Sequence, residues 1–410
     1  SPRAARPEGA RTGGGGPGRG GRVVAQVAFT LTLLAVAALF TQGLIRARRA
    51  PLGFDPQQVQ TWTMDPQQIG ASPAQGLELY RQLTERVRAL PQVTSAALSS
   101  TVPLSDTGSN DYLKIGRYAN PPGKGMPLVA YSVVSTGYFE TLRIPMVQGR
   151  AFRDTDRAGT TPVAIVNQAF AAQYWPGLNP IGQHFAKVSG ITNPNYEVVG
   201  VARDSRTGTL SGPMPAYFYL PLEQNYLLAT AETLSVRSAA NPAVLQHEVE
   251  ATVRRLAPAL PVYDVGSLEA ELESPNGWLL YQFGAVLAVM LAGVGLLLAG
   301  LGVYGVVAHS AAQRTHEIAV RMALGAEPRA ILGLLLRQGL AVAGIGIALG
   351  WLGAVAAARW SASLLSGVGD SDPATLAGVS AFLLAVALAA CYLPARKVLR
   401  TDPARALRQE

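Results

Sequence analysis

Four long apolar stretches limit the possible folds of this sequence more than any other feature. They cover residues 23–45, 278–308, 331–358 and 373–395. A helix needs about 20 consecutive apolar residues to cross the hydrocarbon core of a bilayer. Several helices of this length that are apolar on every side would be unusual in one soluble domain. The sequence therefore predicts a membrane protein with four transmembrane helices.

The first stretch has a rival interpretation as a cleaved signal peptide, because Arg22 directly precedes it. A signal peptide has an apolar region of about 7–15 residues, which a small-residue cleavage site follows. The stretch at 23–45 is longer than that, and no clear site of this kind comes after it. We therefore interpret it as the first transmembrane helix.

Basic residues predict the orientation of the helices. The net charge is +4 in residues 1–22, +1 in 311–329 and +3 in 394–410, and together these equal the +8 of the whole chain. Four crossings place the three segments on one side, which the positive-inside rule makes cytoplasmic. The arginines within 46–49 lie on the other side and are an exception. The high isoelectric point is thus a topology signal, and no nucleic-acid partner is predicted.

Residues 50–275 then form an extracytoplasmic domain between the first two transmembrane helices. The domain has no cysteine, so it must rely on its own hydrophobic core. Helical spacing of apolar residues predicts helices at about 74–90 and 242–257. Together with short β-rich runs this indicates an α+β fold, in which 106–210 is inserted into a subdomain made of the two ends. The predicted strands are 93–99, 128–135, 163–167, 196–202, 216–220, 233–237 and 261–265.

Motifs that indicate chemistry are few. Gly-rich runs at 13–18 and 300–305 match the dinucleotide-binding pattern, but neither joins a strand to a helix as that pattern requires. The sequence contains no GxxxxGKS/T phosphate-binding loop. His247 and His316 each precede a glutamate, but the second histidine of the zinc-protease pattern is absent. We predict no enzyme activity, no catalytic residue, no metal site and no cofactor for this chain.

Glycines are concentrated in the second and third apolar stretches. Gly346 and Gly350 form a GxxxG pattern, and Gly293 and Gly300 belong to a second glycine-rich run. Small residues let the backbones of two membrane helices approach closely. The four glycines are therefore predicted to lie at a helix-packing seam within the chain or at a dimer interface, and both alternatives stay open.

The cytoplasmic loop at 311–327 is predicted to form a short amphipathic helix. Its charged and apolar residues can lie on different faces, Gly325 ends the helix and Pro328 begins the next one. Such a helix can lie on the membrane surface or dock into a cytoplasmic partner, and geometry alone does not choose between them. The residues that would contact a partner are Arg314, Glu317, Ile318, Arg321, Leu324 and Gly325.

At this loop the sequence resembles a known family. The runs QRTHEIAVRMALGAEPRAIL at 313–332 and PARKVLRTDPARALRQE at 394–410 resemble the FtsX-like permease domain of ABC transporters. His316 stands where that family often has a basic residue. Three further runs resemble the MacB-like periplasmic core domain: YSVVSTGYFETLRIPMVQGRAF, VAIVNQAFAAQYWPGLNPIGQHF and YEVVGVARD.

The resemblance implies the permease subunit of an ABC transporter of the mechanotransmission type, a multi-pass protein of the bacterial cytoplasmic (inner) membrane. A separate cytoplasmic ATPase would bind and hydrolyse ATP, and 311–327 would be the coupling helix seated in a cleft of that ATPase. Closure of the ATPase would move the second and third transmembrane helices and, through them, the extracytoplasmic domain. Efflux, extraction of a substrate and signalling to cell-wall enzymes all remain open.

The two ends of the sequence carry a further expectation. The sequence begins at Ser1, residues 1–22 resemble a cytoplasmic Gly/Arg-rich linker, and residues 396–410 form a cytoplasmic tail. We expect the C-terminal repeat of a duplicated permease, paired with a second permease half, or otherwise a homodimer. The alternative function is a membrane receptor with an extracytoplasmic ligand-binding domain. The short cytoplasmic segments disfavour it because a receptor needs an output domain.

Overall fold

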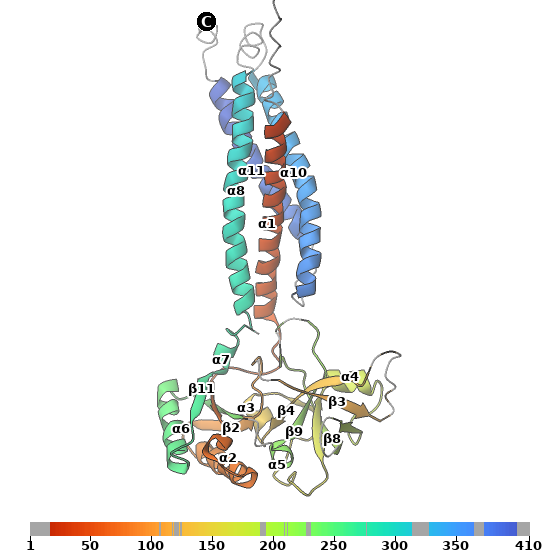
Figure 1. Cartoon of the computed structure of the whole chain (residues 1–410), viewed down its shortest axis with the longest axis vertical. Coiled ribbons are helices and arrows are strands. Elements are labelled where there is room, and N and C mark those ends of the chain that lie inside the picture. Colours follow the sequence, from red (N-terminus) through yellow and green to blue (C-terminus); the bar gives the residue numbers. More distant parts are fainter. Residues whose placement is uncertain are drawn as a thin grey trace, which may run out of the picture. The chain divides into compact units, whose positions relative to one another are not determined.

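The structure is a computed structural model, and the chain divides into two compact units (Figure 1). One unit is Ala47–Leu280, and the other consists of the helices before and after it in the sequence. The structure describes residues 17–399 apart from 106–107, 117, 119–122, 124, 189–193, 209, 211, 227–230, 276, 314–327 and 365–372.

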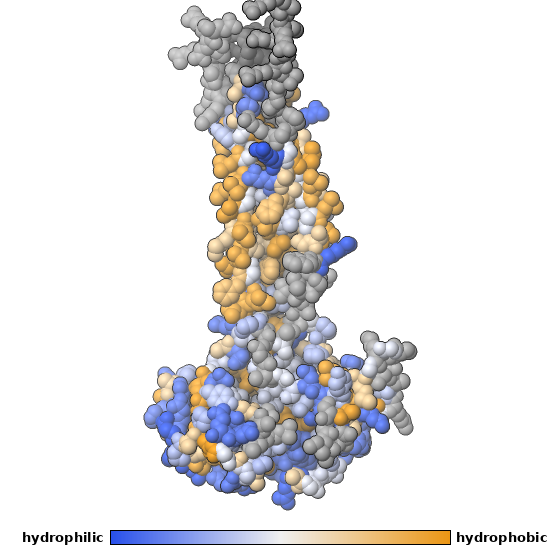
Figure 2. Space-filling view, in the orientation of Figure 1, coloured by the Kyte–Doolittle hydropathy of each residue, from blue (hydrophilic) through white to orange (hydrophobic). Residues whose placement is uncertain are grey.

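Within the described residues, the helical unit contains four helices that are long and apolar enough to cross a membrane. They are α1 (Pro17–Arg49), α8 (Leu279–Gln313), α10 (Pro328–Leu364) and α11 (Pro373–Leu399). Apolar side chains gather on the outer surface of these helices in Figure 2, whereas the surface of the other unit is largely hydrophilic. The predicted fold class, four transmembrane helices with an α+β domain inserted after the first, is confirmed.

The two ends of the extracytoplasmic domain form one antiparallel sheet. It contains β1 (Val59–Met64), β2 (Val93–Ser99), β10 (Glu232–Ser238) and β11 (Val262–Ser267), in the spatial order β11-β1-β10-β2. Helix α2 (Pro73–Arg88) follows β1, and helix α6 (Pro242–Leu256) follows β10. This is the ferredoxin-like arrangement of two βαβ units. We call this part the ferredoxin-like subdomain.

Both of its helices begin where the sequence supplies a cap. Ser72 and Gln75 form a capping box at the start of α2, and Pro73 occupies the first turn. Asn241 accepts a hydrogen bond from the amide of Ala243 at the start of α6, which Pro242 also opens. The predicted helices at 74–90 and 242–257 are confirmed.

The middle of the domain is a ring of strands between β2 and β10, which we call the barrel subdomain. The ring runs β4-β3-β7-β8-β6-β9 and closes because β4 pairs in parallel with β9. Strand β5 is an additional short strand of the barrel and pairs with β8. The short helices η1, between β1 and α2, and α7, after β11, belong to the two ends of the domain instead. The bounds are β3 (Ser109–Ile115), β4 (Leu128–Val134), α3 (Tyr138–Thr141), β5 (Met146–Gly149), β6 (Val163–Asn167), α4 (Gln168–Tyr174), β7 (His184–Lys187), β8 (Asn195–Ala202), β9 (Tyr217–Pro221), α5 (Leu222–Asn225), η1 (Pro66–Ile69) and α7 (Leu268–Glu271).

One hydrophobic cluster runs through both subdomains. In the ferredoxin-like subdomain it contains Trp62 and Tyr80, both fully buried between the sheet and α2. In the barrel it centres on Phe170, whose ring lies within 5.4 Å of those of Trp175 and Phe185. Because the cluster is continuous, it joins the two subdomains.

The predicted strands are confirmed, but β1, β3, β5 and β7 were not predicted. The predicted insertion at 106–210 has different limits in the structure. The chain leaves the ferredoxin-like sheet after Ser99 and returns at Glu232, because Ser99 and Thr233 are partners in adjacent strands. The inserted part is therefore residues 100–231.

Candidate coupling site

The membrane helices contain a close packing seam between α10 and α1. Gly346 and Gly350 of α10 are buried on the side that faces α1. A Cβ atom at Gly346 would lie 2.7 Å from the Cβ of Val27, and one at Gly350 would lie 2.8 Å from the Cβ of Leu31. No larger residue fits without moving a backbone, so glycine permits the close approach of the two helices. These two glycines serve packing within the chain.

Gly293 and Gly300 of α8 have more open surroundings. Among the described residues, a Cβ atom at Gly293 would meet nothing within 4 Å, and one at Gly300 would meet a methyl group of Val386 at 4.0 Å. The structure therefore does not bring these two glycines into the α1–α10 seam. A dimer interface at Gly293 and Gly300 stays a prediction.

Hydrogen bonds join α1 to its neighbours. The Oγ1 hydroxyl of Thr30, which is fully buried, donates to the carbonyl of Gly295 on α8 over 2.9 Å. The side-chain amide of Gln42 donates to the hydroxyl of Thr375 on α11. Together with the α10 seam, these contacts connect α1 to each of the three other helices. A displacement of α8, α10 or α11 therefore acts on α1 through these contacts.

Of the predicted coupling helix at 311–327, residues 311–313 form the end of α8, and residues 314–327 lie outside the described residues. The residues outside include each of the candidate contacts: Arg314, Glu317, Ile318, Arg321, Leu324 and Gly325. The structure shows α8 continuing to Gln313 and α10 beginning at Pro328.

In the extracytoplasmic domain, a surface groove separates α2 from the barrel. We call this groove the crease. Arg88 at the end of α2 spans it, because its Nε donates to the carbonyl of Ala96 over 2.8 Å and its Nη2 donates to the carbonyl of Thr136. Two hollows of about 460 and 430 Å³ lie along the crease and share Arg88, Thr136 and Asp154 in their walls. Arg88 therefore connects the ferredoxin-like subdomain to the barrel at a position between the two hollows.

Charged side chains of both signs line this crease. Burial raises the pKa of Glu223; Arg81 opposes that shift, whereas Asp154 and Glu78 add to it. Asp154 is held in place by the hydroxyl of Thr136, which donates to its carboxylate over 3.1 Å. The crease thus carries a mixed charge pattern rather than a site of one sign.

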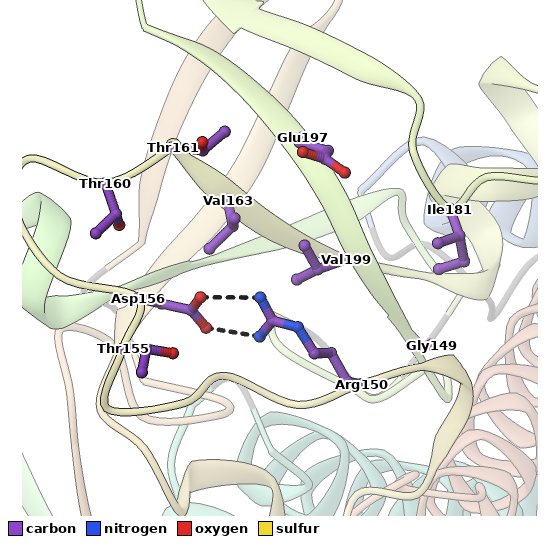
Figure 3. Close-up of a pocket in the computed structure, with 10 residues that line it drawn as sticks. All are labelled: Gly149, Arg150, Thr155, Asp156, Thr160, Thr161, Val163, Ile181, Glu197 and Val199. Carbon is purple, nitrogen blue, oxygen red and sulfur yellow. Dashed lines mark hydrogen bonds and ion pairs between the residues drawn. The ribbon is translucent and has the colours of Figure 1, made fainter.

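A third cleft, of about 590 Å³, lies on the barrel between β5, β6 and β8 (Figure 3). Its two facing charged groups are paired, because Nη1 and Nη2 of Arg150 donate to the two carboxylate oxygens of Asp156 over 2.7 and 2.9 Å. The amide of Arg153 donates to the same carboxylate. Burial alone would raise the pKa of Asp156, but these hydrogen bonds outweigh it and lower the pKa. The pair therefore closes the loop at 150–156 and shapes the cleft.

No group of three or more His, Cys, Asp or Glu side chains that could hold a metal ion lies among the residues that the structure describes. The two His–Glu pairs that begin a zinc-protease pattern lie in different parts of the chain. His247 lies on α6, exposed on its surface, and His316 lies outside the described residues.

Sequence reasoning missed Arg237 of β10. Leu234 and Val236 face the helices α2 and α6, so alternation along the strand places Arg237 on the opposite face of the sheet. Such a position is normally exposed, and an arginine there suggests a surface residue. In the structure the barrel covers that face, and Arg237 is only 2% exposed. Its burial depends on α3, which is far from it in sequence, so no local signal indicates it.

Two family models match parts of this chain. The family model of the MacB-like periplasmic core domain matches residues 24–256, which is more than half of the chain. The chain belongs to this family. The model of the FtsX-like permease C-terminal domain matches residues 289–403, which include α10 and α11 and most of α8. The resemblance seen in the sequence is therefore confirmed.

Relatives of this chain are named as export proteins. The chain is 29% identical over 280 residues to the macrolide export ATP-binding/permease protein MacB of Azoarcus sp., which covers 65% of this chain and 40% of that protein. It is 28% identical over 289 residues to the pyoverdine export ATP-binding/permease protein PvdT of Pseudomonas putida, which covers 67% and 42%. The chain thus spans about two fifths of the length of the curated relatives that it matches.

Two of the solved structures that are similar to this chain are a periplasmic region and an extracellular domain. The periplasmic region of MacB from Actinobacillus actinomycetemcomitans has a TM-score of 0.37 and 13% identity, over 53% of this chain and 92% of that one. The extracellular domain of the noncanonic ABC-type transporter YknZ from Gram-positive bacteria has a TM-score of 0.31 and 14% identity, over 50% and 99%.

Proposed function

We propose that this chain is the permease subunit of an ABC transporter of the mechanotransmission type in the bacterial inner membrane. Motion of its extracytoplasmic domain exports or extracts a substrate on that side of the membrane. One observation carries the proposal: an FtsX-like set of membrane helices and a MacB-like domain lie in one chain, with the domain inserted after the first helix.

In this proposal, a partner protein binds and hydrolyses ATP. The 410 residues contain no phosphate-binding loop of the GxxxxGKS/T type, whereas the named relatives are ATP-binding/permease proteins. We assign ATP binding and hydrolysis to a separate cytoplasmic ABC ATPase, and we assign its docking to the coupling helix at 311–327. The resemblance of the run EIAVRMALGA to the FtsX-like family supports this assignment.

The helix contacts support a route for the motion. The coupling helix lies between α8 and α10 in the chain, so a displacement of the ATPase acts on those two helices first. Helix α1 contacts α8 through Thr30 and α10 through Gly346 and Gly350. Because α1 and α8 lead into opposite ends of the extracytoplasmic domain, a relative movement of the two helices changes the position of the domain.

Co-purification of a tagged full-length chain from detergent-solubilised membranes tests the proposal. The wild-type chain recovers an ABC ATPase, and the double variant Glu317→Ala/Arg321→Ala loses it. A matched control is Glu78→Ala/Arg81→Ala, which removes a similar charge pair from α2 of the extracytoplasmic domain. Normal recovery by the 317/321 variant contradicts the assignment of the coupling helix, and absence of any ATPase with the wild-type chain favours a receptor.

A second permease half or a second copy of this chain completes the transporter in this proposal. Two ATPase subunits need two coupling helices, and this chain has one segment that resembles the family's coupling helix. Native mass spectrometry of the purified complex measures which of the two arrangements exists. A complex that contains one copy of this chain and no other permease contradicts both.

A further inference from the structure

The segment between α1 and β1, residues 50–58, is held against the barrel subdomain. We call it the exit segment, because it carries the chain out of the first membrane helix. The carbonyl of Leu52 accepts a hydrogen bond from the amide of Arg206 over 2.8 Å, and the amide of Asp55 donates to the carbonyl of Leu142 over 2.9 Å. The segment is therefore attached to two separate parts of the barrel before it enters β1.

Gly53 shows how close this approach is. Its φ angle is +78°, a conformation that favours glycine. A Cβ atom at this position would lie 2.0 Å from the carbonyl oxygen of Asp204 and 2.7 Å from the Cα of Ser205. A side chain cannot be placed there without moving the backbone. The exit segment and the loop at 204–206 are thus in direct backbone contact.

Arg237 of β10 joins the exit segment to both subdomains at once. Its Nε donates to the carbonyl of Thr141 at the end of α3 over 2.7 Å. Its Nη1 donates to the carbonyl of Gln57, and its Nη2 donates to the carbonyl of Asp55, both over 2.6 Å. The guanidinium also lies 3.4 Å from the Asp55 carboxylate. One buried fork of donors therefore connects a strand of the ferredoxin-like sheet, a helix of the barrel and the chain arriving from α1.

The attachment of the other membrane helix is different. Helix α8 follows β11, which lies at the edge of the ferredoxin-like sheet and pairs with β1. The register of that pairing shifts between Thr61 and Thr63, and Asp264 of β11 has a φ angle of +48°. Helix α7 is anchored mainly by the buried side chains of Leu268 and Leu272. An irregular edge strand and one turn of helix hold this end of the domain.

We propose that Arg237 is a clamp that fixes the exit segment to both subdomains, so that a force arriving along the chain from α1 is passed to the ferredoxin-like sheet and to the barrel together. The inference rests on the proposed function for the source of the force. The rigidity of the clamp itself can be measured without that source.

The chemistry of the side chain explains why an arginine occupies this position. Arginine is planar and permanently charged, and it presents five donors in a fixed geometry. It can therefore hold three backbone carbonyl groups at fixed relative positions, which a lysine ammonium does less well. The Asp55 carboxylate supplies a nearby counter-charge, and it also pairs with Arg143 over 2.7 Å. Arg237 is a positioning residue, since it acts on the membrane helix through the backbone of the exit segment.

Hydrogen–deuterium exchange on the full-length chain in lipid nanodiscs tests the clamp. In the wild-type chain the amide of Asp55, which donates to the carbonyl of Leu142, exchanges slowly. In Arg237→Met the exchange of 50–58 accelerates by about 10- to 100-fold, because charge-assisted hydrogen bonds are lost. The matched control is Arg143→Met, which removes an arginine from the same carboxylate but from a position where the side chain is 59% exposed. An unchanged rate at 50–58 in Arg237→Met overturns the proposal.

A covalent replacement separates a clamp from a general role in folding. Asp55→Cys and Arg143→Cys are introduced together with Arg237→Met in a Cys391→Ala background, since Cys391 is the one native cysteine. Bridging the two cysteines with a short reducible linker restores slow exchange at 50–58, and reduction removes the effect. Failure of the bridge to restore slow exchange overturns the proposal. If Arg237→Met does not accumulate, the same comparison is made with Arg237→Lys.

A third measurement connects the clamp to the transporter. Labels at Lys114 of the barrel and Gln313 at the end of α8 report the position of the domain in the complex with its ATPase. The wild-type complex shows an ATP-dependent change of the distance between the labels, and Arg237→Met loses that change. No change in the wild-type complex contradicts the proposed function but not the clamp. A full change in Arg237→Met contradicts the clamp and leaves the proposed function intact.

Discussion

The extracytoplasmic domain and the membrane helices bury opposite kinds of side chain. The largest fully buried residues of the domain are aromatic, among them Trp62, Tyr80 and Phe170. The helices bury mostly small residues such as Ala292 and Gly350, while leucine and phenylalanine are largely exposed on their outer surface. Water drives large apolar groups inward in the domain, but lipid is as apolar as they are and supplies no such drive. Helix association therefore depends on close backbone approach and hydrogen bonds.

The same difference explains the two roles of glycine. Gly53 of the exit segment is needed because its φ angle is positive and a carbonyl group is close. Gly346 has an ordinary helical conformation and is needed because α1 lies against it. In the domain, glycine permits a turn with a positive φ angle. In the membrane helices, glycine permits two helices to pack closely. Substitutions at each kind of position should therefore fail for different reasons.

The largest expected effect is on the aromatic core of the domain. Phe170→Ala removes a fully buried ring that packs on Tyr174, Trp175, Phe185 and Phe218. We expect a loss of about 3–5 kcal/mol of unfolding free energy, measured by denaturant unfolding of the full-length chain. The matched control is Leu178→Ala, where the side chain is 50% exposed and the change should stay within about 0.5 kcal/mol. Equal effects at both positions would contradict the assignment of the core.

The next effect is on the α1–α10 seam. Gly350→Leu forces a side chain against Leu31 and the carbonyl of Ala28. Overpacking of this kind destabilises by about 1–3 kcal/mol or more. Gly344→Leu on the same helix is the control, because a Cβ atom there meets nothing within 4 Å among the described residues. Unfolding in mixed detergent micelles should distinguish the two, and a larger loss at Gly344 would mean that a second chain covers that face.

A buried carboxyl group in the domain gives a pH-dependent prediction. Glu232 is 1% exposed, neither of its carboxyl oxygens has a hydrogen-bond partner in the described structure, and burial raises its pKa well above the usual range. The folded state therefore holds a proton that the unfolded state releases above about pH 4.3. Stability falls as the pH rises from there towards the folded pKa.

Glu232→Gln keeps the shape of the protonated group and removes this dependence. We expect the variant to become more stable than the wild-type chain as the pH rises above about 4.3, and the difference to shrink below about pH 4. Thermal melting followed by circular dichroism at several pH values measures it. The control is Glu85→Gln, at an exposed position on α2. A variant that is less stable at pH 7 would show that the carboxylate is charged and needed.

The smallest expected effect concerns a single hydrogen bond between membrane helices. Thr30→Val keeps the shape of the side chain but removes the bond to the carbonyl of Gly295. Such bonds contribute about 0.6 kcal/mol on average. Thr41→Val is the matched control, because the hydroxyl of Thr41 donates within its own helix to Ala37. If the two variants unfold alike, the interhelical bond adds nothing to the association of α1 with α8.

Much of the fold follows from the sequence because its signals are local. Length and composition predict the four membrane helices, and caps such as Ser72 and Asn241 mark the starts of α2 and α6. The missed strands are of another kind. Strand β3 mixes polar and apolar residues, and its buried Asp111 pairs with Lys187 of β7 over 3.2 Å. Only the ring closure makes that position suitable for a charge, and ring closure depends on contacts between distant residues.

The candidate site divides in the same way. The GxxxG pattern of Gly346 and Gly350 indicated close packing, but which surface they contact could not be deduced from one helix alone. Arg237 could not be predicted at all, since its partners Thr141 and Asp55 lie far from it in sequence. A membrane seam is visible in sequence because small residues are spaced regularly. A buried clamp is a single residue whose role depends on what covers it.

The point where the barrel joins the ferredoxin-like sheet has an evolutionary consequence. Ser99 and Thr233 are cross-strand partners, so residues 100–231 begin and end at one place in a single hairpin. A segment inserted in this way can be lengthened, shortened or exchanged between lineages without moving either membrane helix. One condition applies to such changes. The backbone at 141–142 and 204–206 must keep its position, because the exit segment and Arg237 contact it there.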